Sequence, residues 1–285
     1  LVKHLDKKAV VINEEGLPYG YEFMPHADKI KKISKKLWGM RFGCFVVLDC
    51  SDLRRCGEVG RLASSAKTIL NIDHHISNEK FGDVNWVDPK AASCTEMVYQ
   101  LYKKLRIPFD KDAATLLYTG IVTDTGSFRY VNTNRSTHLI AAELLKFDLD
   151  VAKIYKVIYE NVPFSDMQLL SNILPTIKRD PSGKIAWFQI RKKLLKNRKV
   201  YFDLTENILT FARAIRDVEV AVLFKENLKT KNEIRVNLRS QGRVDVNKIA
   251  SFFGGGGHRT ASGCTVKGDI ETVSRMVLRK IRESI

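Results

Sequence analysis

Residues 68–75 read Thr-Ile-Leu-Asn-Ile-Asp-His-His, and this stretch decides the fold. Its apolar, β-branched start predicts a strand covered on both faces, as in a parallel sheet. A second apolar run, residues 45–48, also ends in an aspartate, Asp49. Residues 53–67 leave room for a short helical crossover, so the two runs predict a βαβ unit. Parallel strands would place Asp49 and Asp73 at the same edge of the sheet.

Outward from this unit, helices are expected to alternate with strands. Ser93 and Glu96 form a capping-box pattern at the start of a helix, and a second helix over 112–122 leads into a turn that carries Asp124. Residues 136–174 keep a helical pattern that breaks at 161–163. A strand at 185–190, a helix at 204–216, strands at 218–224 and 234–238 and two further helices follow.

These patterns predict an α/β fold in two domains. We expect a first domain at 1–163, with a mainly parallel sheet flanked by helices, a linker at 164–183, and a smaller α/β domain at 184–285. A length of 285 residues fits two hydrophobic cores. Hydrophobic residues at 44% and charged residues at 28% are typical of a soluble globular protein.

Charge and cysteine usage narrow the class of protein. Lys and Arg outnumber Asp and Glu by 48 to 32, a formal charge of +16 that favours polyanionic partners or reflects a charged, solvated surface. The 5 cysteines form no C-x-x-C pair, which argues against a disulfide framework and a zinc ribbon. We expect a cytoplasmic protein without a membrane segment, since no apolar run approaches the length of a membrane helix.

The Asp73-His74-His75 sequence is the strongest candidate for chemistry. Adjacent histidines leaving a strand point in opposite directions, so one can bind a metal while the other faces a substrate oxygen. A capped loop is the alternative, but several ionisable groups buried together are costly without a metal or a catalytic role. Carboxylates with a few imidazoles suit Mn²⁺ or Mg²⁺. Asp124 is a further carboxylate that the fold could bring to this edge.

A glycine run at 254–257 followed by His258 and Arg259 is the second candidate. Backbone N–H groups without Cβ obstruction can converge on an anion, so the run predicts a phosphate cradle, with a flexible hinge as the alternative. Arg239 and Ser240, at the end of a predicted strand, could contact the same phosphate. The densest basic stretch, 191–199, could follow a nucleic-acid backbone, although a solvated face is the more common meaning of such a run.

These residues together resemble the DHH/DHHA1 phosphoesterase family. Asp73-His74-His75 matches the motif that names the family, residues 47–49 and 123–128 look like its flanking aspartate motifs, and 254–258 matches the DHHA1 domain. The arrangement is most similar to the NrnA-like group of nanoRNases and pAp phosphatases. The resemblance implies two Mn²⁺ ions, with Mg²⁺ as an alternative, and substrate contacts in the second domain. It implies these roles: metal ligands Asp49, His74 and Asp124; catalytic residues Asp73 and His75; substrate contacts Arg239, Ser240, Gly256, Gly257, His258 and Arg129.

One family motif, His-x-Asp-x-Asp near the amino terminus, does not occur in this sequence. His4-Leu5-Asp6 is followed by Lys7, and His26-Ala27-Asp28 is followed by Lys29. At this stage we expect that the chain is truncated at its amino terminus, and that it binds metal poorly and has little activity.

The function that these features favour is hydrolysis of phosphate esters in short oligoribonucleotides or in 3′-phosphoadenosine 5′-phosphate. Two alternatives stay open: a cyclic-dinucleotide phosphodiesterase, and a non-catalytic nucleic-acid-binding protein in which the basic surface matters. The expected partner is a short RNA or a nucleotide. A homodimer is compatible with the sequence, which leaves the oligomeric state, the substrate length, the polarity of cleavage and the choice of RNA or DNA open.

Overall fold

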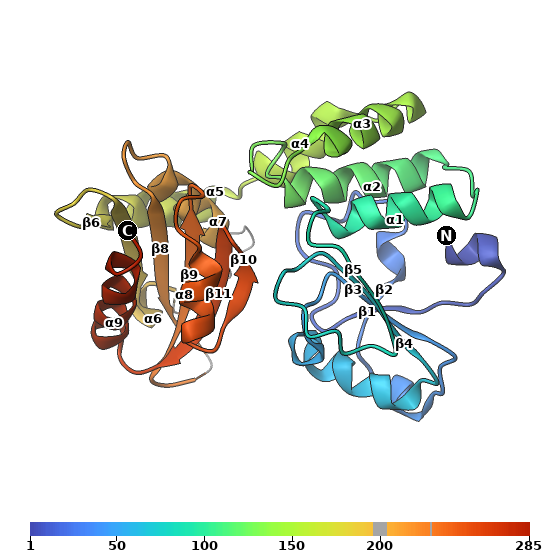
Figure 1. Cartoon of the computed structure of the whole chain (residues 1–285), viewed down its shortest axis with the longest axis horizontal. Coiled ribbons are helices and arrows are strands. Elements are labelled where there is room, and N and C mark those ends of the chain that lie inside the picture. The colour runs from blue at the N-terminus through green and yellow to red at the C-terminus, as the bar shows by residue number, and fades with distance from the viewer. Residues whose placement is uncertain (196–203, 229) are drawn as a thin grey trace. The chain divides into compact units, whose positions relative to one another are not determined.

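The computed structural model describes residues 1–195, 204–228 and 230–285, and the chain forms two compact units, Leu1–Asn161 and Val162–Ile285. Both units combine strands with helices (Figure 1), which confirms the α/β class. No helix in these described ranges is long and apolar enough to cross a membrane.

The first unit is built on a parallel sheet in the order β3-β4-β5. Its strands are β3 (Phe45–Leu48), β4 (Ile69–Asp73) and β5 (Val84–Val87). The predicted parallel pairing of the two apolar runs is confirmed, with Phe45 opposite Ile69 and Leu48 opposite Ile72. A separate parallel pair precedes this sheet and consists of β1 (Val11–Asn13) and β2 (Ile30–Lys32).

The crossover between β3 and β4 is a 3₁₀ helix, Leu53–Ser65. Gly57 interrupts it with φ 57° and ψ −139°, a conformation outside the helical region. The helical crossover was therefore predicted correctly in place, and Gly57 supplies the kink that divides it, a conformation that glycine adopts without a Cβ penalty.

Helices α1 (Cys94–Lys104) and α2 (Lys111–Asp124) lie side by side in Figure 1 and contact each other. Ser93 caps α1 by accepting from the Glu96 N–H, and Asp110 caps α2 by accepting from the Ala113 N–H. Buried Met97 of α1 packs against Ile72 of β4. Asp124 is the last residue of α2 and so does not lie in the turn that follows it.

The rest of the predicted helical stretch forms three helices: α3 (Arg135–Leu144), α4 (Val151–Tyr159) and α5 (Phe164–Ile173). The helices α3 and α4 complete the core around α2, whereas Leu169, Leu170 and Ile173 of α5 belong to a core of the second unit. Residues 164–183, which we expected to be a linker, are thus folded as α5, a 3₁₀ turn and β6 (Lys178–Arg179), and α5 packs within that unit.

The second unit contains a mixed sheet in the order β10-β11-β9-β8-β7-β6. One face is covered by α8 (Val246–Phe252) and α9 (Ile270–Arg282), and the other by α5 and α7 (Leu204–Arg213). Alternate residues along 185–190 and 220–224 therefore belong to two separate cores. Beyond α5 and β6, the elements are β7 (Ile185–Ile190), α6 (Lys192–Leu195), α7 (Leu204–Arg213), β8 (Val220–Glu226), β9 (Glu233–Ser240), α8 (Val246–Phe252), β10 (Gly256–His258), β11 (Ala261–Lys267) and α9 (Ile270–Arg282).

The sequence did not predict β10 and β11. Most of the glycine run lies in or beside this antiparallel hairpin, in which Gly256 is opposite Gly263 and His258 is opposite Ala261. Apolar alternation over the hairpin is weak because six of its residues are glycine, serine or threonine, so no strand pattern stands out.

Candidate functional site

The ends of β3 and β4 bring two aspartates to one edge of the first sheet. Asp73 is the last residue of β4, and Asp49 directly follows β3, where its N–H donates to the Ile72 carbonyl at 3.0 Å. Asp49 adopts the left-handed conformation, with φ 59°. Non-glycine residues seldom adopt it, and aspartate is among those that tolerate it best. The sharp turn directs the chain away from the sheet immediately after Asp49.

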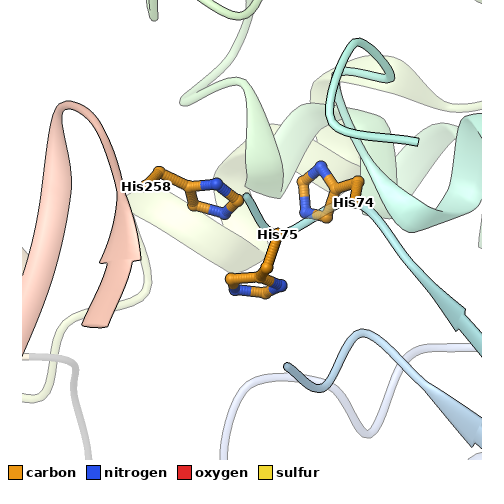
Figure 2. A group of neighbouring side chains, drawn as sticks. All are labelled: His74, His75 and His258. Carbon is orange, nitrogen blue, oxygen red and sulfur yellow. The ribbon is translucent and has the colours of Figure 1, made fainter. Parts of the chain in front are cut away.

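The two histidines leave β4 in different directions. Figure 2 shows the His74 and His75 rings, whose planes make an angle of 76° with their centroids 5.2 Å apart. The Nδ1 atom of His74 lies 3.1 Å from the Ala91 carbonyl, and its Nε2 atom lies 3.2 Å from Oδ1 of Asp49. Because a carbonyl only accepts, Nδ1 of His74 carries a proton and Nε2 is the atom that faces the carboxylates.

Asp124 reaches the same place from the end of α2. Its Oδ2 atom is 3.7 Å from Nε2 of His74. The structure thus brings Asp49, His74 and Asp124 together, with one possible ligand atom from each lying within 4.8 Å of the other two. A second group, Asp49, Asp73 and His75, meets the same criterion.

Asp73 is fully buried and accepts hydrogen bonds at both of its carboxylate oxygens. Oδ1 accepts from Nδ1 of His75 at 2.7 Å and from the N–H of His74 at 2.8 Å, and Oδ2 accepts from Nδ2 of Asn78 at 2.6 Å. Burial alone would raise the pKa of Asp73, but the hydrogen bonds from His75 and Asn78 outweigh it and lower this pKa to about 2. Asp73 is therefore a carboxylate that orients His75.

The remaining charges of this cluster are strongly coupled. Burial raises the pKa of Asp124 to about 7, helped by the negative charge of Asp49. Burial opposes protonation of His74, but the hydrogen bond with Asp49 and the charge of Asp124 raise its pKa to about 9. For Asp49, burial is outweighed by the hydrogen bond and charge of His74, so its pKa is lowered. Asp49 and Asp124 both face His74, and this excess of carboxylates around one imidazole calls for a positive charge.

A divalent cation fits this donor set. Oxygen atoms of Asp49 and Asp124 together with Nε2 of His74 form the mixed carboxylate and imidazole set that Mn²⁺ or Mg²⁺ prefers over thiolate-rich zinc sites. The hydrogen bond from Nδ1 of His74 to a backbone carbonyl is the usual support of a metal-binding histidine. Because its pKa is raised, the His74 ring otherwise keeps a second proton, and a bound cation would take the place of that proton.

Arg129 lies five residues beyond Asp124 in the same unit. It is exposed, and its Nε atom donates to the Gly126 carbonyl at 2.7 Å. Gly126 has φ 55°, and an added Cβ would lie 2.3 Å from the Tyr130 ring, so the turn that places Arg129 requires a glycine.

The predicted substrate residues of the second unit occupy two strands, β9 and β10, that are separated by β11 in the sheet. The Nη2 atom of Arg239 lies 2.7 Å from Oε2 of Glu206, and Ser240 is buried with its hydroxyl donating to the Val244 carbonyl at 2.7 Å. Gly256, Gly257 and His258 form β10, which pairs with β11, next to the strand that carries Arg239. Figure 2 shows the His258 side chain at the end of β10.

The basic stretch 191–199 is only partly described. Arg191 forms an ion pair with Glu271 at 2.5 Å, and Lys192 donates through Nζ to the Thr230 carbonyl at 2.7 Å. Residues 196–199, which include three of its basic side chains, lie outside the described residues. The predicted contact with a nucleic-acid backbone stays a prediction.

Sequence reasoning missed three polar groups beside the cluster. They are the carbonyl of Ala91, which accepts from His74, and the side chains of Asn78 and Asn132. Asn78 follows the two histidines by only three residues, which was a usable signal. Asn132 gave no signal, because its partners are backbone atoms that only the tertiary fold brings near.

Comparison with known proteins agrees with this fold. Residues 5–121 match the model described as "DHH family, N-terminal domain", and residues 202–283 match the DHHA1 domain. The bifunctional oligoribonuclease and PAP phosphatase NrnA of Thermus thermophilus is 33% identical over 76% of this chain and 64% of its own length. The protein of the same name from Bacillus subtilis is 31% identical over 78% of this chain and 69% of its own length.

A solved structure gives the same result for the fold. The exopolyphosphatase-related protein from Bacteroides fragilis superposes with a TM-score of 0.84 at 27% identity, covering 98% of this chain and 85% of that chain. The aligned region spans about two thirds of the length of the curated relatives, 64% and 69% in the two cases above. The chain therefore belongs to the DHH family, in the NrnA-like group that carries a DHHA1 domain.

Proposed function

We propose that this chain is a metal-dependent phosphoesterase. The observation that carries the proposal is the convergence of Asp49, His74 and Asp124, with ligand atoms within 4.8 Å of one another, at the carboxyl ends of parallel strands. Open α/β sheets bind their ligands at this edge.

The proposed substrates are short oligoribonucleotides and 3′-phosphoadenosine 5′-phosphate. Support comes from the two NrnA relatives, whose names describe an oligoribonuclease and a PAP phosphatase. The formal charge of +16 suits such polyanions, because it raises their local concentration at low ionic strength.

The proposed cofactor is Mn²⁺, as two ions, with Mg²⁺ as the alternative. Asp49, His74 and Asp124 would hold metal directly, and Asp73 would support them. Bound cations of this kind lower the pKa of a bound water and neutralise charge on the phosphate.

His75 is proposed to contact the scissile phosphate. Its Nδ1 atom is engaged by Oδ1 of Asp73 at 2.7 Å, so contact with substrate falls to Nε2. The buried carboxylate therefore leaves Nε2 as the ring atom that can exchange a proton with the substrate. Asp73 thus sets both the ring orientation and the proton position of His75.

Residues of the DHHA1 domain are proposed to bind the rest of the substrate. Arg239 can offer its guanidinium to a phosphate if it exchanges Glu206 for that ligand, and His258 can add a charge-assisted hydrogen bond. Backbone groups of Gly256 and Gly257 and the hydroxyl of Ser240 complete this proposed set. In the first unit Arg129 is a further proposed contact.

The test is hydrolysis of a 5′-phosphorylated RNA dinucleotide by the chelated protein, with and without added Mn²⁺. The proposal expects Mn²⁺-dependent release of mononucleotides, at a low rate because the sequence has no His-x-Asp-x-Asp motif to supply further metal ligands. It also expects a further loss of at least about a hundredfold in His74→Ala, which removes a metal ligand. Asn85→Ala, which removes an exposed side chain of β5 that is hydrogen-bonded to Gly82, is the control.

Two other outcomes would replace this assignment. Turnover of a cyclic dinucleotide but not of the linear one would identify a cyclic-dinucleotide phosphodiesterase. Binding of RNA without any turnover, unchanged by Mn²⁺, would identify a non-catalytic nucleic-acid-binding protein.

A further inference from the structure

The proposed metal and phosphate ligands come from three separate segments of the first unit. Asp49 follows β3, the group 73–75 ends β4, and Asp124 ends α2. Catalytic groups need to be held to within a fraction of an ångström, so something must fix these three segments relative to one another. Two asparagine side chains lie where they meet.

Asn78 joins the end of β3 to the end of β4. Its Nδ2 atom lies 2.6 Å from Oδ2 of Asp73 and 3.2 Å from the carbonyl oxygen of Cys50, the residue after Asp49. Its Oδ1 atom accepts from the N–H of Lys80 at 2.7 Å, which fixes the orientation of the amide. Asn71 of β4 supports the same carbonyl, with Nδ2 at 3.3 Å from it.

Asn132 joins the end of α2 to the loop that orients His74. Its Nδ2 atom lies 3.0 Å from the carbonyl oxygen of Asp124 and 2.8 Å from that of Ala92. The neighbouring carbonyl, that of Ala91, accepts from Nδ1 of His74 at 3.1 Å. Two carbonyl acceptors on one amide group again leave a single orientation for the side chain.

We propose that Asn78 and Asn132 are positioning residues that hold the three ligand-bearing segments in one frame. Asn78 fixes β3 against β4 and keeps Asp73 aligned with His75, while Asn132 fixes α2 against the loop that aligns His74. This inference rests on the proposed function, since it assigns a role toward the metal and phosphate ligands of that site. Neither asparagine contacts metal or substrate in this role.

The chemistry of the amide explains why asparagine occupies both positions. Each Nδ2 group has two hydrogens in a fixed plane, so one side chain can reach acceptors on two chain segments. A hydroxyl has only one hydrogen to donate, and a carboxylate would face carbonyl or carboxylate oxygens. Loss of such supporting partners weakens metal binding or activity by roughly 10- to 100-fold in other metal sites.

The experiment compares Asn78→Ala and Asn132→Ala with the control Asn85→Ala. The side chain of Asn85 in β5 also uses its amide group to hold the chain, donating to the Gly82 carbonyl and accepting from the Gly82 N–H. Asn85 is exposed, and these hydrogen bonds involve none of the proposed metal or phosphate ligands. The full chain is freed of metal by chelation, and Mn²⁺ binding is then measured by titration calorimetry. Denaturant unfolding of each variant shows that it is folded.

We expect Mn²⁺ affinity to fall roughly 10- to 100-fold in Asn78→Ala and Asn132→Ala and to stay at the wild-type value in Asn85→Ala. A second readout needs no metal: the ¹⁵N shifts of the His75 ring report which nitrogen carries the proton. We expect the wild-type ring to be protonated at Nδ1, and Asn78→Ala to show a mixture of tautomers. If either alanine variant fails to fold, Asn78→Asp and Asn132→Asp remove the donors without loss of volume.

The outcomes distinguish this inference from the proposed function. Folded variants with Mn²⁺ affinity within a factor of about three of the wild type, and an unchanged His75 spectrum, overturn the positioning role alone. A wild-type chain that neither binds Mn²⁺ nor cleaves the dinucleotide overturns the proposed function, and the inference falls with it.

Discussion

The Nδ1 atom of His75 lies 2.7 Å from Oδ1 of Asp73, whose side chain has no solvent exposure. The second oxygen of the same carboxylate accepts from Asn78 at 2.6 Å. A buried carboxylate with donors on both oxygens is fixed in position and charge, and it fixes the ring of His75 in turn. The arrangement makes Asp73 the residue whose chemistry is easiest to test.

Asp73→Asn should reduce activity with little change of shape. An amide presents one oxygen and one NH₂ group, so it cannot accept from both His75 and Asn78, and one of these contacts is lost. We expect kcat/KM for an RNA dinucleotide to fall by at least about tenfold. Steady-state kinetics at saturating Mn²⁺ would measure the fall.

Asp83→Asn is the matched control for that change. Oδ2 of Asp83 accepts from the N–H of Ile69 at 2.7 Å, at the opposite end of β4. We expect this variant to keep wild-type kcat/KM. An equal loss in both variants would mean that the effect arises from the stability of β4, and the role of Asp73 toward His75 would be wrong.

The chelated protein should lose stability as the pH rises from about 6.5 to about 9. The pKa of His74 is raised to about 9 by the carboxylates around it, so its protonated form stabilises the fold below the unfolded value of about 6.5, and this contribution is lost through about pH 9. The pKa of Asp124 is also raised, to about 7, because burial disfavours its charged form in the folded state. Protonated Asp124 therefore also stabilises the fold, and this contribution is lost over a lower pH range, up to about pH 7. The contribution of His74 alone is on the order of 3 kcal/mol.

Thermal unfolding between pH 6.5 and 9 in a chelator, repeated with Mg²⁺, would check this. Bound cation should replace the proton and flatten the pH dependence. In His74→Gln the chelated protein should lack the decline associated with His74. A chelated wild-type protein whose stability is constant over this range would contradict the charge balance that we derive for the cluster.

Ser240→Ala should destabilise the second unit. The buried hydroxyl donates to the Val244 carbonyl at 2.7 Å, and its removal leaves that carbonyl without this donor. We expect the free energy of unfolding to fall by roughly 1–3 kcal/mol. Ser171→Ala is the control, because the exposed Ser171 hydroxyl makes a similar bond to the Gln168 carbonyl at 2.8 Å and should cost little. A raised KM without loss of stability would instead favour the direct substrate contact proposed for Ser240.

The parallel pair of strands and its carboxylates could be predicted because their signals are local. Apolar runs that end in Asp49 and Asp73 define strands, and parallel pairing then sets both residues at one edge. The length of the crossover was also evident, but it is divided by a kink at Gly57, whose φ of 57° and ψ of −139° lie outside the helical region. Composition does not specify that conformation.

Tertiary contacts explain what the sequence could not predict. Asn132 binds the carbonyl groups of Ala92 and Asp124, which lie 40 and 8 residues away in the chain. The hairpin at 256–267 lacks a strand pattern, and its glycines are set by close approach between strands rather than by an open loop. The glycine run therefore predicted positions where a side chain cannot be accommodated, but it did not reveal which neighbouring strand excludes the side chain.

Gly255→Ala should be strongly destabilising, because a Cβ at this position would lie 2.2 Å from the carbonyl oxygen of Gly263 and 2.5 Å from Cβ of Cys264. Both atoms belong to the strand β11, which cannot shift without a cost in stability. We expect a loss of about 3 kcal/mol or more, as is found for overpacked sites where the backbone must shift. Gly254→Ala meets no atom within 4 Å, but φ is +74°, so it should cost only the roughly 1–2 kcal/mol of a left-handed alanine. Denaturant unfolding of the two variants would measure the difference, and equal losses would mean that backbone conformation, rather than close packing against β11, accounts for the glycine at 255.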